Sequence, residues 1–314
     1  MTVQTSASGR VRQSAFAIIF ASLLLGFTDN LVMYLSDDIG LWQFHVLRGL
    51  TVLAMLFIQA AIMRVSLLPK NWVPVLFRCF CLTMAILMFF AALPVTGAAV
   101  AGAGMFTAPI FVLLFSMLLF SESIGIYRTI AVFVGSIGVI LILDITNSHF
   151  SVFALIPVLA GAYYAINNIA TRRICADETP QSLLFSYTMM ITLFSAGMAT
   201  LMDFVVLPDD LSEGALYLVR GWEPVSNYNA MIILINGVGA FAALLALTWG
   251  YQQAETSYVA IYEYSYLIFA GFFGWVFWQD ALSLQSIGGI ILIVFAGSLI
   301  MMRTGKNSEI HNSE

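Results

Sequence analysis

Charged residues are scarce in this chain. Only 9% of the 314 residues are Asp, Glu, Lys or Arg, whereas 61% are hydrophobic and the mean hydropathy is +0.95. A soluble domain of this length needs roughly a quarter of its residues charged to cover its surface. The composition therefore predicts an integral membrane protein in a lipid bilayer. Lys and Arg form no basic patch, so we expect no nucleic-acid partner.

Cysteine and histidine are also rare. Three cysteines, Cys79, Cys81 and Cys175, are too few for a disulfide framework, and their apolar settings favour buried thiols. Cys79 and Cys81 point to different faces of a helix, so we expect no metal site. His45 is the only histidine in an apolar run, and no His-Glu-x-x-His or nucleotide-binding motif occurs. We therefore expect no cofactor and no ATP-driven step, and a membrane-embedded enzyme is disfavoured.

Long apolar runs dominate what remains. They predict an all-α polytopic membrane protein, because backbone groups in hydrocarbon must bond within their own segment. We expect ten spans, at residues 14–34, 41–63, 72–93, 97–120, 127–145, 150–171, 181–206, 229–251, 256–278 and 284–302. A cleaved signal peptide is the alternative for the first run, but that run is long enough to cross a bilayer and no small-x-small cleavage site follows it.

A repeat organises these spans. With a shift of 158 positions, residues 96–122 align with residues 254–280, and both copies end on an acid, Glu122 and Asp280. With five spans in each half, the second copy must lie upside down in the membrane. Inverted halves around one central site are the arrangement that alternating access requires. We therefore expect two five-helix units, 14–145 and 150–302, between terminal tails 1–13 and 303–314.

The distribution of charge predicts the orientation. A cytoplasmic N-terminus places nearly all the basic residues on the inner side, with only Arg220 outside and Arg48 within a span, as the positive-inside rule favours. The inner set is Arg10, Arg12, Arg64, Lys70, Arg78, Arg128, Arg172, Arg173, Arg303 and Lys306. We therefore expect both tails to be cytoplasmic. The longest connection, 207–228, is expected to be a solvated loop with one short helix and with Tyr217 and Trp222 at the headgroup boundary; a lid is the alternative.

Three motifs carry a resemblance to a known family. They are the FAALPVTGAAVAG turn followed by Pro109 and Glu122, the Arg48 segment FHVLRGLTVLAML, and GWVFWQDALSLQSIGG in the second copy. Together they resemble the drug/metabolite transporter superfamily, in its ten-helix EamA-type branch, over about residues 14–303. The resemblance implies a transporter built from paired inverted repeats in a bacterial inner membrane. One departure is visible: where the family often reads Glu-Pro midway along the ninth helix, this chain has Tyr266-Leu267, with an acid at Glu263.

Ionisable residues inside the expected spans are the candidate functional groups, because a buried charge costs about 3 kcal/mol or more unless it is paired or hydrated. These residues are Asp29 with its neighbour Asn30, Arg48 with His45 one turn away, and Glu263. Asp29 and Arg48 either form a structural ion pair or bind substrate, with Arg48 holding a carboxylate and Asp29 a cation or a proton.

Glu263 is the strongest of these candidates. Tyr262 and Tyr266 flank it, and an acid among aromatic rings suits an ammonium group or a proton; the alternative is an acid hydrogen-bonded to tyrosine hydroxyls. Further candidates are Tyr163 and Asn167, four residues apart on the sixth span, and Trp249, which also fits an interface belt. Pro109 is a candidate gate hinge.

These residues favour a secondary transporter of a small polar or amphipathic metabolite. The combination of acids, an arginine and aromatic rings favours an amino-acid-like or betaine-like zwitterion, moved by exchange or with protons. A membrane-embedded enzyme or a channel are the alternatives, although no filter-like loop or charged ring is present. The sequence is compatible with a monomer or a homodimer.

Overall fold

Every regular element in the described part of the chain is a helix. The computed structural model describes residues 7–120, 130, 133–138, 141, 155–205, 213–253, 262–279, 283–292 and 294–296. The elements are α1 (Ala7–Leu31), the 3-10 helix η1 (Val32–Tyr34), α2 (Leu41–Met63), α3 (Trp72–Met105), α4 (Ala108–Phe120), α6 (Ile156–Arg173), α7 (Pro180–Met202), α8 (Glu213–Val219), α9 (Asn227–Gln253) and α11 (Ser265–Trp278). The expected all-α class is confirmed.

Five of the helices are long and apolar enough to cross a membrane. They are Arg12–Tyr34, Leu41–Met63, Trp72–Ala98, Pro180–Met202 and Asn227–Gln253. Val100–Val112, Ser265–Trp278 and Leu284–Ala296 are shorter apolar helices. Most of the span expected at 127–145 lies outside the described residues, as do 256–261 and 297–302. The count of ten therefore stays a prediction.

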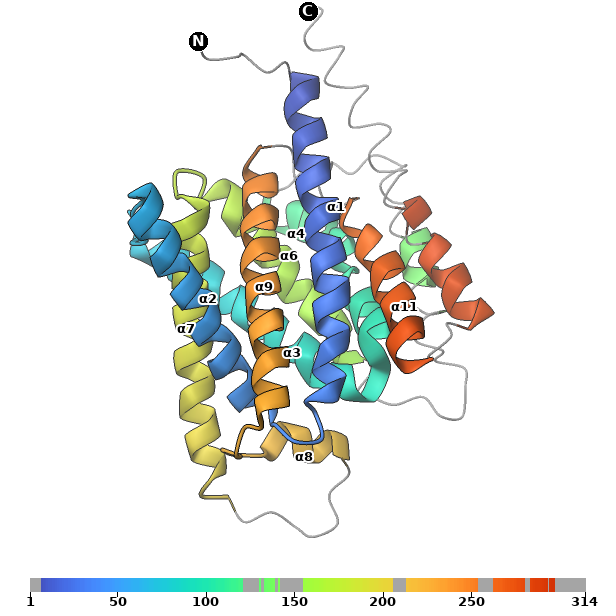
Figure 1. Ribbon diagram of the computed structural model, residues 1–314. Coiled ribbons are helices and arrows are strands. Elements are labelled where there is room, and N and C mark those ends of the chain that lie inside the picture. The colour runs from blue at the N-terminus through green and yellow to red at the C-terminus, as the bar shows by residue number, and fades with distance from the viewer. Residues whose placement is uncertain are drawn as a thin grey trace, which may run out of the picture.

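The long helices form a bundle in which α1, α2, α7 and α9 run along a common direction, with α8 lying across one end (Figure 1). Within it, α1 packs against α9 and α11, α6 packs against α3 and α4, and α2 packs against α7. Small residues allow two of these close approaches. A Cβ atom added at Gly26 would lie 2.9 Å from the backbone nitrogen of Ala270, and one at Gly161 would lie 2.9 Å from the carbonyl oxygen of Met105.

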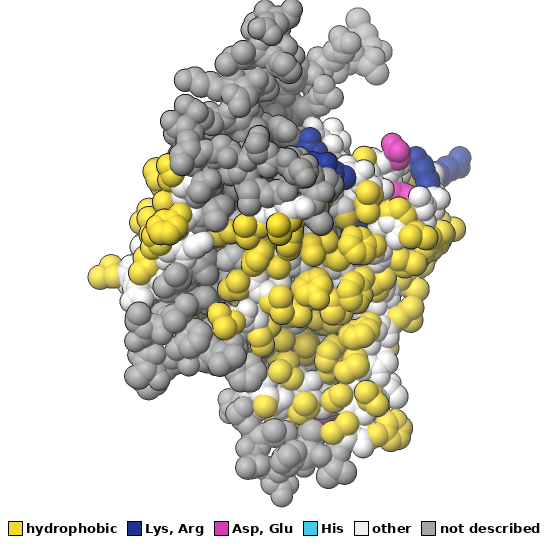
Figure 2. Space-filling model, turned by 180° about the vertical axis from the view of Figure 1, so that it is seen from behind, with side chains coloured by type: hydrophobic (Ala, Val, Ile, Leu, Met, Phe, Trp, Pro, Cys, Tyr) yellow, Lys and Arg dark blue, Asp and Glu magenta, His cyan; other side chains and the backbone are white. Residues whose placement is uncertain are grey.

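The outside of the bundle is apolar. Figure 2 shows hydrophobic side chains over a broad face, with the Lys and Arg side chains gathered near its upper end. Large apolar side chains such as Ile62, Val73 and Phe133 are at least 70% exposed. An apolar surface of this extent would be a liability in water and suits contact with lipid acyl chains.

The expected fourth and ninth spans are both interrupted. Gly97, with a φ of 74° and a ψ of 160°, kinks α3 at the expected turn, so the range of α3 contains two helical segments, one before Gly97 and one after it that ends at Met105. The chain then leaves the helical path at Phe106 and Thr107, and α4 begins at Ala108. We expected a bend at Pro109, but the break comes before it and Pro109 lies in the first turn of α4, where proline is tolerated. In the second copy, a turn at Tyr264 precedes α11.

The connection between α7 and α9 contains the expected short helix, α8. Tyr217, however, is fully buried in the main apolar core rather than at a headgroup boundary. Trp222 is 41% exposed. All three cysteines are buried free thiols, as expected.

Candidate functional site

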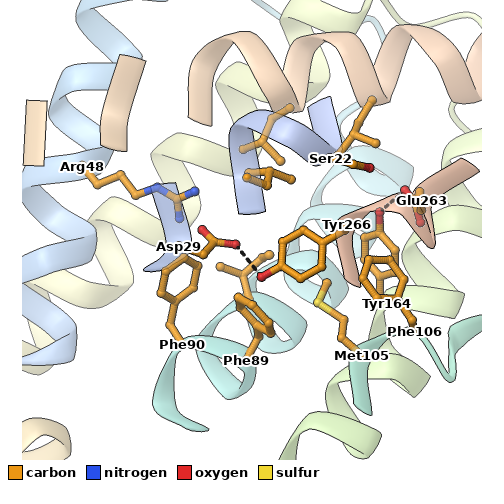
Figure 3. Close-up of a pocket in the computed structure, with 14 residues that line it drawn as sticks. Ser22, Asp29, Arg48, Phe89, Phe90, Met105, Phe106, Tyr164, Glu263 and Tyr266 are labelled. Carbon is orange, nitrogen blue, oxygen red and sulfur yellow. Dashed lines mark hydrogen bonds between the residues drawn. The ribbon is translucent and has the colours of Figure 1, made fainter. Parts of the chain in front are cut away.

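An internal cavity lies where the interrupted helices meet. Its volume is about 60 Å³, room for a few water molecules. Side chains from α1, α2, α3, α6, α9 and the segment around α11 line it: Ser22, Leu25, Asp29, Arg48, Ile86, Phe89, Phe90, Met105, Phe106, Tyr164, Leu244, Leu247, Glu263 and Tyr266 (Figure 3). The cavity therefore brings together the three charged residues that the sequence singled out.

Asp29 reaches the cavity from α1. Its side chain is 3% exposed, and Oδ2 accepts a hydrogen bond of 3.1 Å from the hydroxyl of Tyr266. The other carboxylate oxygen, Oδ1, has no hydrogen-bond partner. A buried carboxylate oxygen without a partner loses the hydration it would have in water. Asp29 therefore retains an unused acceptor at the cavity.

Arg48 faces Asp29 from α2, but the two side chains form no ion pair within 4.0 Å in the structure. The guanidinium instead lies over the ring of Phe90, 4.8 Å from its centroid, and Nε has no hydrogen-bond partner. The face of an aromatic ring attracts a cation but leaves its N–H donors free. Of the two alternatives from the sequence, the locked ion pair is therefore not the arrangement that the structure has.

Glu263 lies just before α11 and is buried. Its Oε1 accepts a 2.8 Å hydrogen bond from the hydroxyl of Tyr164 on α6. We expected the neighbouring Tyr262 and Tyr266 to surround this acid. Tyr266 bonds Asp29 instead, and Tyr262 packs on a separate apolar cluster with Ile18 and Tyr251. The partner of Glu263 thus comes from a helix about one hundred residues away in the chain.

The remaining candidates lie outside this cavity. Asn30 fastens α1 to α11, because its Nδ2 donates to the carbonyl oxygens of Gly26 and Ala270. His45 is buried between Phe44 and Phe90, and its Nε2 has no partner. Tyr163 is partly buried against the core, and Trp249 is partly buried.

Asn167 lines a second, neighbouring cavity. Its walls are Arg78, Leu82, Tyr164, Asn167, Asn168, Thr171, Leu184, Tyr187, Leu244, Leu247, Thr248 and Tyr251. We placed Arg78 with the cations of the inner surface, but it is only 4% exposed and lies inside the bundle. An arginine six residues into an apolar run is a signal that could have identified it from the sequence. Tyr164 also belongs to the site, since it lines both cavities.

The described residues contain no group of three or more His, Cys, Asp or Glu side chains placed to hold a metal ion. The polar groups of the two cavities are carboxylates, guanidinium groups, amides and tyrosine hydroxyls. Such groups bind and orient a polar molecule through charge and hydrogen bonds.

Comparison with known proteins agrees with this architecture. Residues 12–144 match the EamA-like transporter family. The chain is 27% identical over 203 residues to a riboflavin transporter of Brucella anthropi, and 28% identical over 202 residues to a pseudopaline exporter of Pseudomonas aeruginosa. Each alignment covers 63% of this chain and 64% of the relative, so the chain matches just under two thirds of the length of these proteins.

Two further matches extend over most of the chain. A riboflavin transporter of Vibrio cholerae is 25% identical over 276 residues, which are 84% of this chain and 86% of that protein. A solved crystal structure of a protein superposes with a TM-score of 0.64 at 17% identity, over 92% of this chain and 96% of that chain, and so shares its fold. By these matches, residues 12–144 are similar to the EamA-like transporter family, and the chain is similar over most of its length to bacterial metabolite transporters.

Proposed function

We propose that this protein is a secondary transporter that carries a small polar metabolite across a bacterial inner membrane by alternating access. The observation that supports this most is the cavity in which Asp29, Arg48 and Glu263 are buried together without a direct ion pair. Charges at such depth are costly, so their retention favours a role with a ligand. The match to a family of transporters argues against the alternative of a membrane-embedded enzyme.

The proposed architecture is ten helices in two inverted units, 14–145 and 150–302. Reciprocal packing supports it: α1 contacts α9 and α11, and α6 makes the corresponding contacts with α3 and α4. The helix breaks support it as well, because Phe106 and Tyr264 are 158 residues apart, the shift that relates the two copies. The rings of these two residues contact each other, with centroids 6.1 Å apart. The pseudo-twofold axis of the proposed repeat would then pass beside the cavity.

A zwitterion, amino-acid-like or betaine-like, is the proposed substrate. Arg48 offers free donors to a carboxylate, while Asp29 and Glu263 offer charge to a cationic group, and Phe89, Phe90 and Phe106 supply apolar walls. The relatives named as riboflavin and pseudopaline transporters support a metabolite as the cargo class. The cavity of about 60 Å³ is too small for any of these molecules, so the proposed carrier must open to load its substrate.

Energy would come from exchange or from protons, with Glu263 or Asp29 as the proton-binding group. We also propose that both tails face the cytoplasm, which the excess of basic residues on that side supports. In this orientation, the connection between α2 and α3 is cytoplasmic and the connection that contains α8 is outside.

A ligand screen followed by counterflow tests the proposal. The purified protein is heated with amino acids, betaines, nucleosides and riboflavin, since a ligand that binds the folded state raises its unfolding temperature. The compound with the largest effect is then used in proteoliposomes. A carrier accelerates the entry of labelled compound when unlabelled compound is trapped inside, whereas a channel does not and an enzyme would convert it chemically. Equal entry with and without trapped compound would refute the carrier mechanism.

Glu263→Gln is the matching variant. It retains the size of the side chain and its contact with Tyr164 but removes the charge. We expect transport to be lost or uncoupled from pH, with normal expression and a normal unfolding temperature. Glu223→Gln, at an exposed side chain outside the cavity, is the matched control and should transport normally. If Glu263→Gln shows ordinary pH-dependent uptake, Glu263 has no part in the mechanism.

A further inference from the structure

The second cavity differs from the first in the sign of its charge. The first contains two carboxylates and one guanidinium, whereas the second contains Arg78 and no Asp or Glu among its lining residues. Its volume is about 30 Å³, enough for about one water molecule. Tyr164, Leu244 and Leu247 line both cavities, so the two are separated only by shared side chains.

Arg78 is a buried cation without an acidic partner in the described part of the chain. Its Nε donates to Thr171 Oγ1 at 3.0 Å, and Nη1 makes a long contact of 3.4 Å with the carbonyl oxygen of Leu183. It lies six residues after the start of α3, or about 9 Å along the helix axis at 1.5 Å per residue. A guanidinium at this depth retains its charge, and neutral oxygens satisfy its donors without compensating that charge.

The groups around Arg78 also have unused hydrogen-bonding capacity. Asn167 donates to Asn168, but its own Oδ1 is buried without a partner, in a residue that is 3% exposed. Asn168 donates to the hydroxyl of Tyr251 over a long 3.5 Å. Tyr187 and Thr248 add two more hydroxyl groups to the lining. A cation surrounded by amides and hydroxyls can bind an oxyanion of a ligand. The free Oδ1 of Asn167 can accept a hydrogen bond from a hydroxyl group of the same ligand.

We propose that the Arg78 cavity, when the bundle opens, is a second substrate subsite, which receives an anionic group, a carboxylate or a phosphate, on the inner side of the central cavity. This inference rests on the proposed transport function and adds to it a feature of the substrate. Tyr164 lies at the boundary of the two cavities and bonds Glu263, so it would separate a substrate held at Arg78 from the acids of the central cavity.

Binding of simple anions tests the inference without knowledge of the substrate. The unfolding temperature of the protein in neutral detergent is measured with acetate and with inorganic phosphate against chloride at equal ionic strength. We expect a saturable rise of about 2 °C or more in the wild type. Arg78→Gln should abolish the rise, and Arg78→Lys, which retains the charge but not the fork of donors, should weaken apparent affinity about tenfold.

Two matched controls locate the effect. Arg12→Gln changes an exposed arginine and should respond to anions as the wild type does. Arg48→Gln removes the guanidinium that is proposed to bind a carboxylate in the central cavity, and it should retain the part of the response that depends on Arg78. If the response disappears in Arg48→Gln and persists in Arg78→Gln, the anion binds in the central cavity and the inference is wrong. It is equally wrong if the wild type shows no response.

A lipid headgroup is the other source of the same chemistry. The measurement is therefore repeated in nanodiscs of phosphatidylglycerol and of phosphatidylcholine. Stabilisation by phosphatidylglycerol that depends on Arg78, without any response to acetate or phosphate, would identify a lipid site and overturn the substrate subsite. The counterflow experiment is independent of these results. If the protein transports its substrate but binds no anion at Arg78, only this inference is refuted. If it binds the anion but shows no counterflow, only the proposed function is refuted.

Discussion

At Gly161 a single hydrogen atom in place of a side chain allows α6 to reach the end of α3. A Cβ there would lie 2.9 Å and 3.0 Å from the backbone oxygens of Met105 and Gly104. These are backbone atoms that cannot move aside without displacing the helix break. Gly161→Ala should therefore lower the stability by about 1–3 kcal/mol, measured as a lower unfolding temperature in detergent. Gly197→Ala, where nothing lies within 4 Å, should leave it unchanged or raise it slightly.

Tyr164 is a second single residue with a specific role, because its hydroxyl group positions the carboxylate of Glu263. Its hydroxyl donates a 2.8 Å hydrogen bond to Oε1 of Glu263. Tyr164→Phe keeps the ring and removes the bond, and a hydrogen bond to a charged group is worth about 1.5–3 kcal/mol. We expect counterflow to slow by about tenfold or more. Tyr262→Phe, on the separate apolar cluster, should have little effect, and equal loss in both variants would contradict the assignment.

At the scale of elements, Glu178 joins three helices at the end of the bundle that is proposed to face the cytoplasm. Its carboxylate accepts hydrogen bonds from the backbone nitrogens of Lys70 and Asn71, before α3, and from Ser182 in α7. Its carbonyl oxygen accepts from Gln252 at the end of α9. At the opposite end, Asp38 accepts from Asn229 at the start of α9. Hydrogen bonds thus connect the helices at both ends of the bundle in this conformation.

The connection before α7 contains a native reporter for the Glu178 fastening. Cys175 is 1% exposed, and burial raises the pKa of its thiol to about 11, so at pH 7–8 it is neutral and reacts slowly with maleimides. Glu178→Ala should expose Cys175 and lower the pKa of its thiol towards the ordinary value. The rate of maleimide labelling at pH 7.5, measured by peptide mass spectrometry, should then increase by about tenfold or more. Asp177→Ala, at an exposed side chain, is the control. Unchanged labelling in Glu178→Ala would show that this contact does not hold this end of the bundle closed.

At the scale of the whole molecule, the proposed inverted arrangement predicts which connections share a side of the membrane. A cysteine at Ser66, between α2 and α3, should react with an impermeant maleimide only from the cytoplasmic side, and one at Glu223, between α8 and α9, only from outside. Both positions are exposed, whereas the native cysteines are buried and supply little background. Labelling of both positions from the same side would exclude the proposed topology.

The sequence also identified Asp29, Arg48 and Glu263 as one group of interest, because each is an ionisable residue in an apolar run, and the structure places all three at one cavity. Their partners did not follow from sequence. Spacing along a helix suggested Tyr262 and Tyr266 for Glu263, but the helix turns at Tyr264 and the acid meets Tyr164 instead. From the distribution of basic residues, we assigned Arg78 to the cations of the inner surface. That distribution does not show which side of a helix faces the interior of the bundle.

The sequence by itself determined that this chain is a helical membrane protein, and it gave the bounds of Leu41–Met63 to the residue. Partition into a bilayer depends on the summed apolarity of each segment, which is a local property. Only the tertiary structure decided which polar groups meet, where α3 and α4 separate, and that Arg78 faces inward. Apolar residues lie on every side of these helices. Packing against helices from the other half of the chain decides which polar residues turn inward, such as Ser186 and Ser195 on α7.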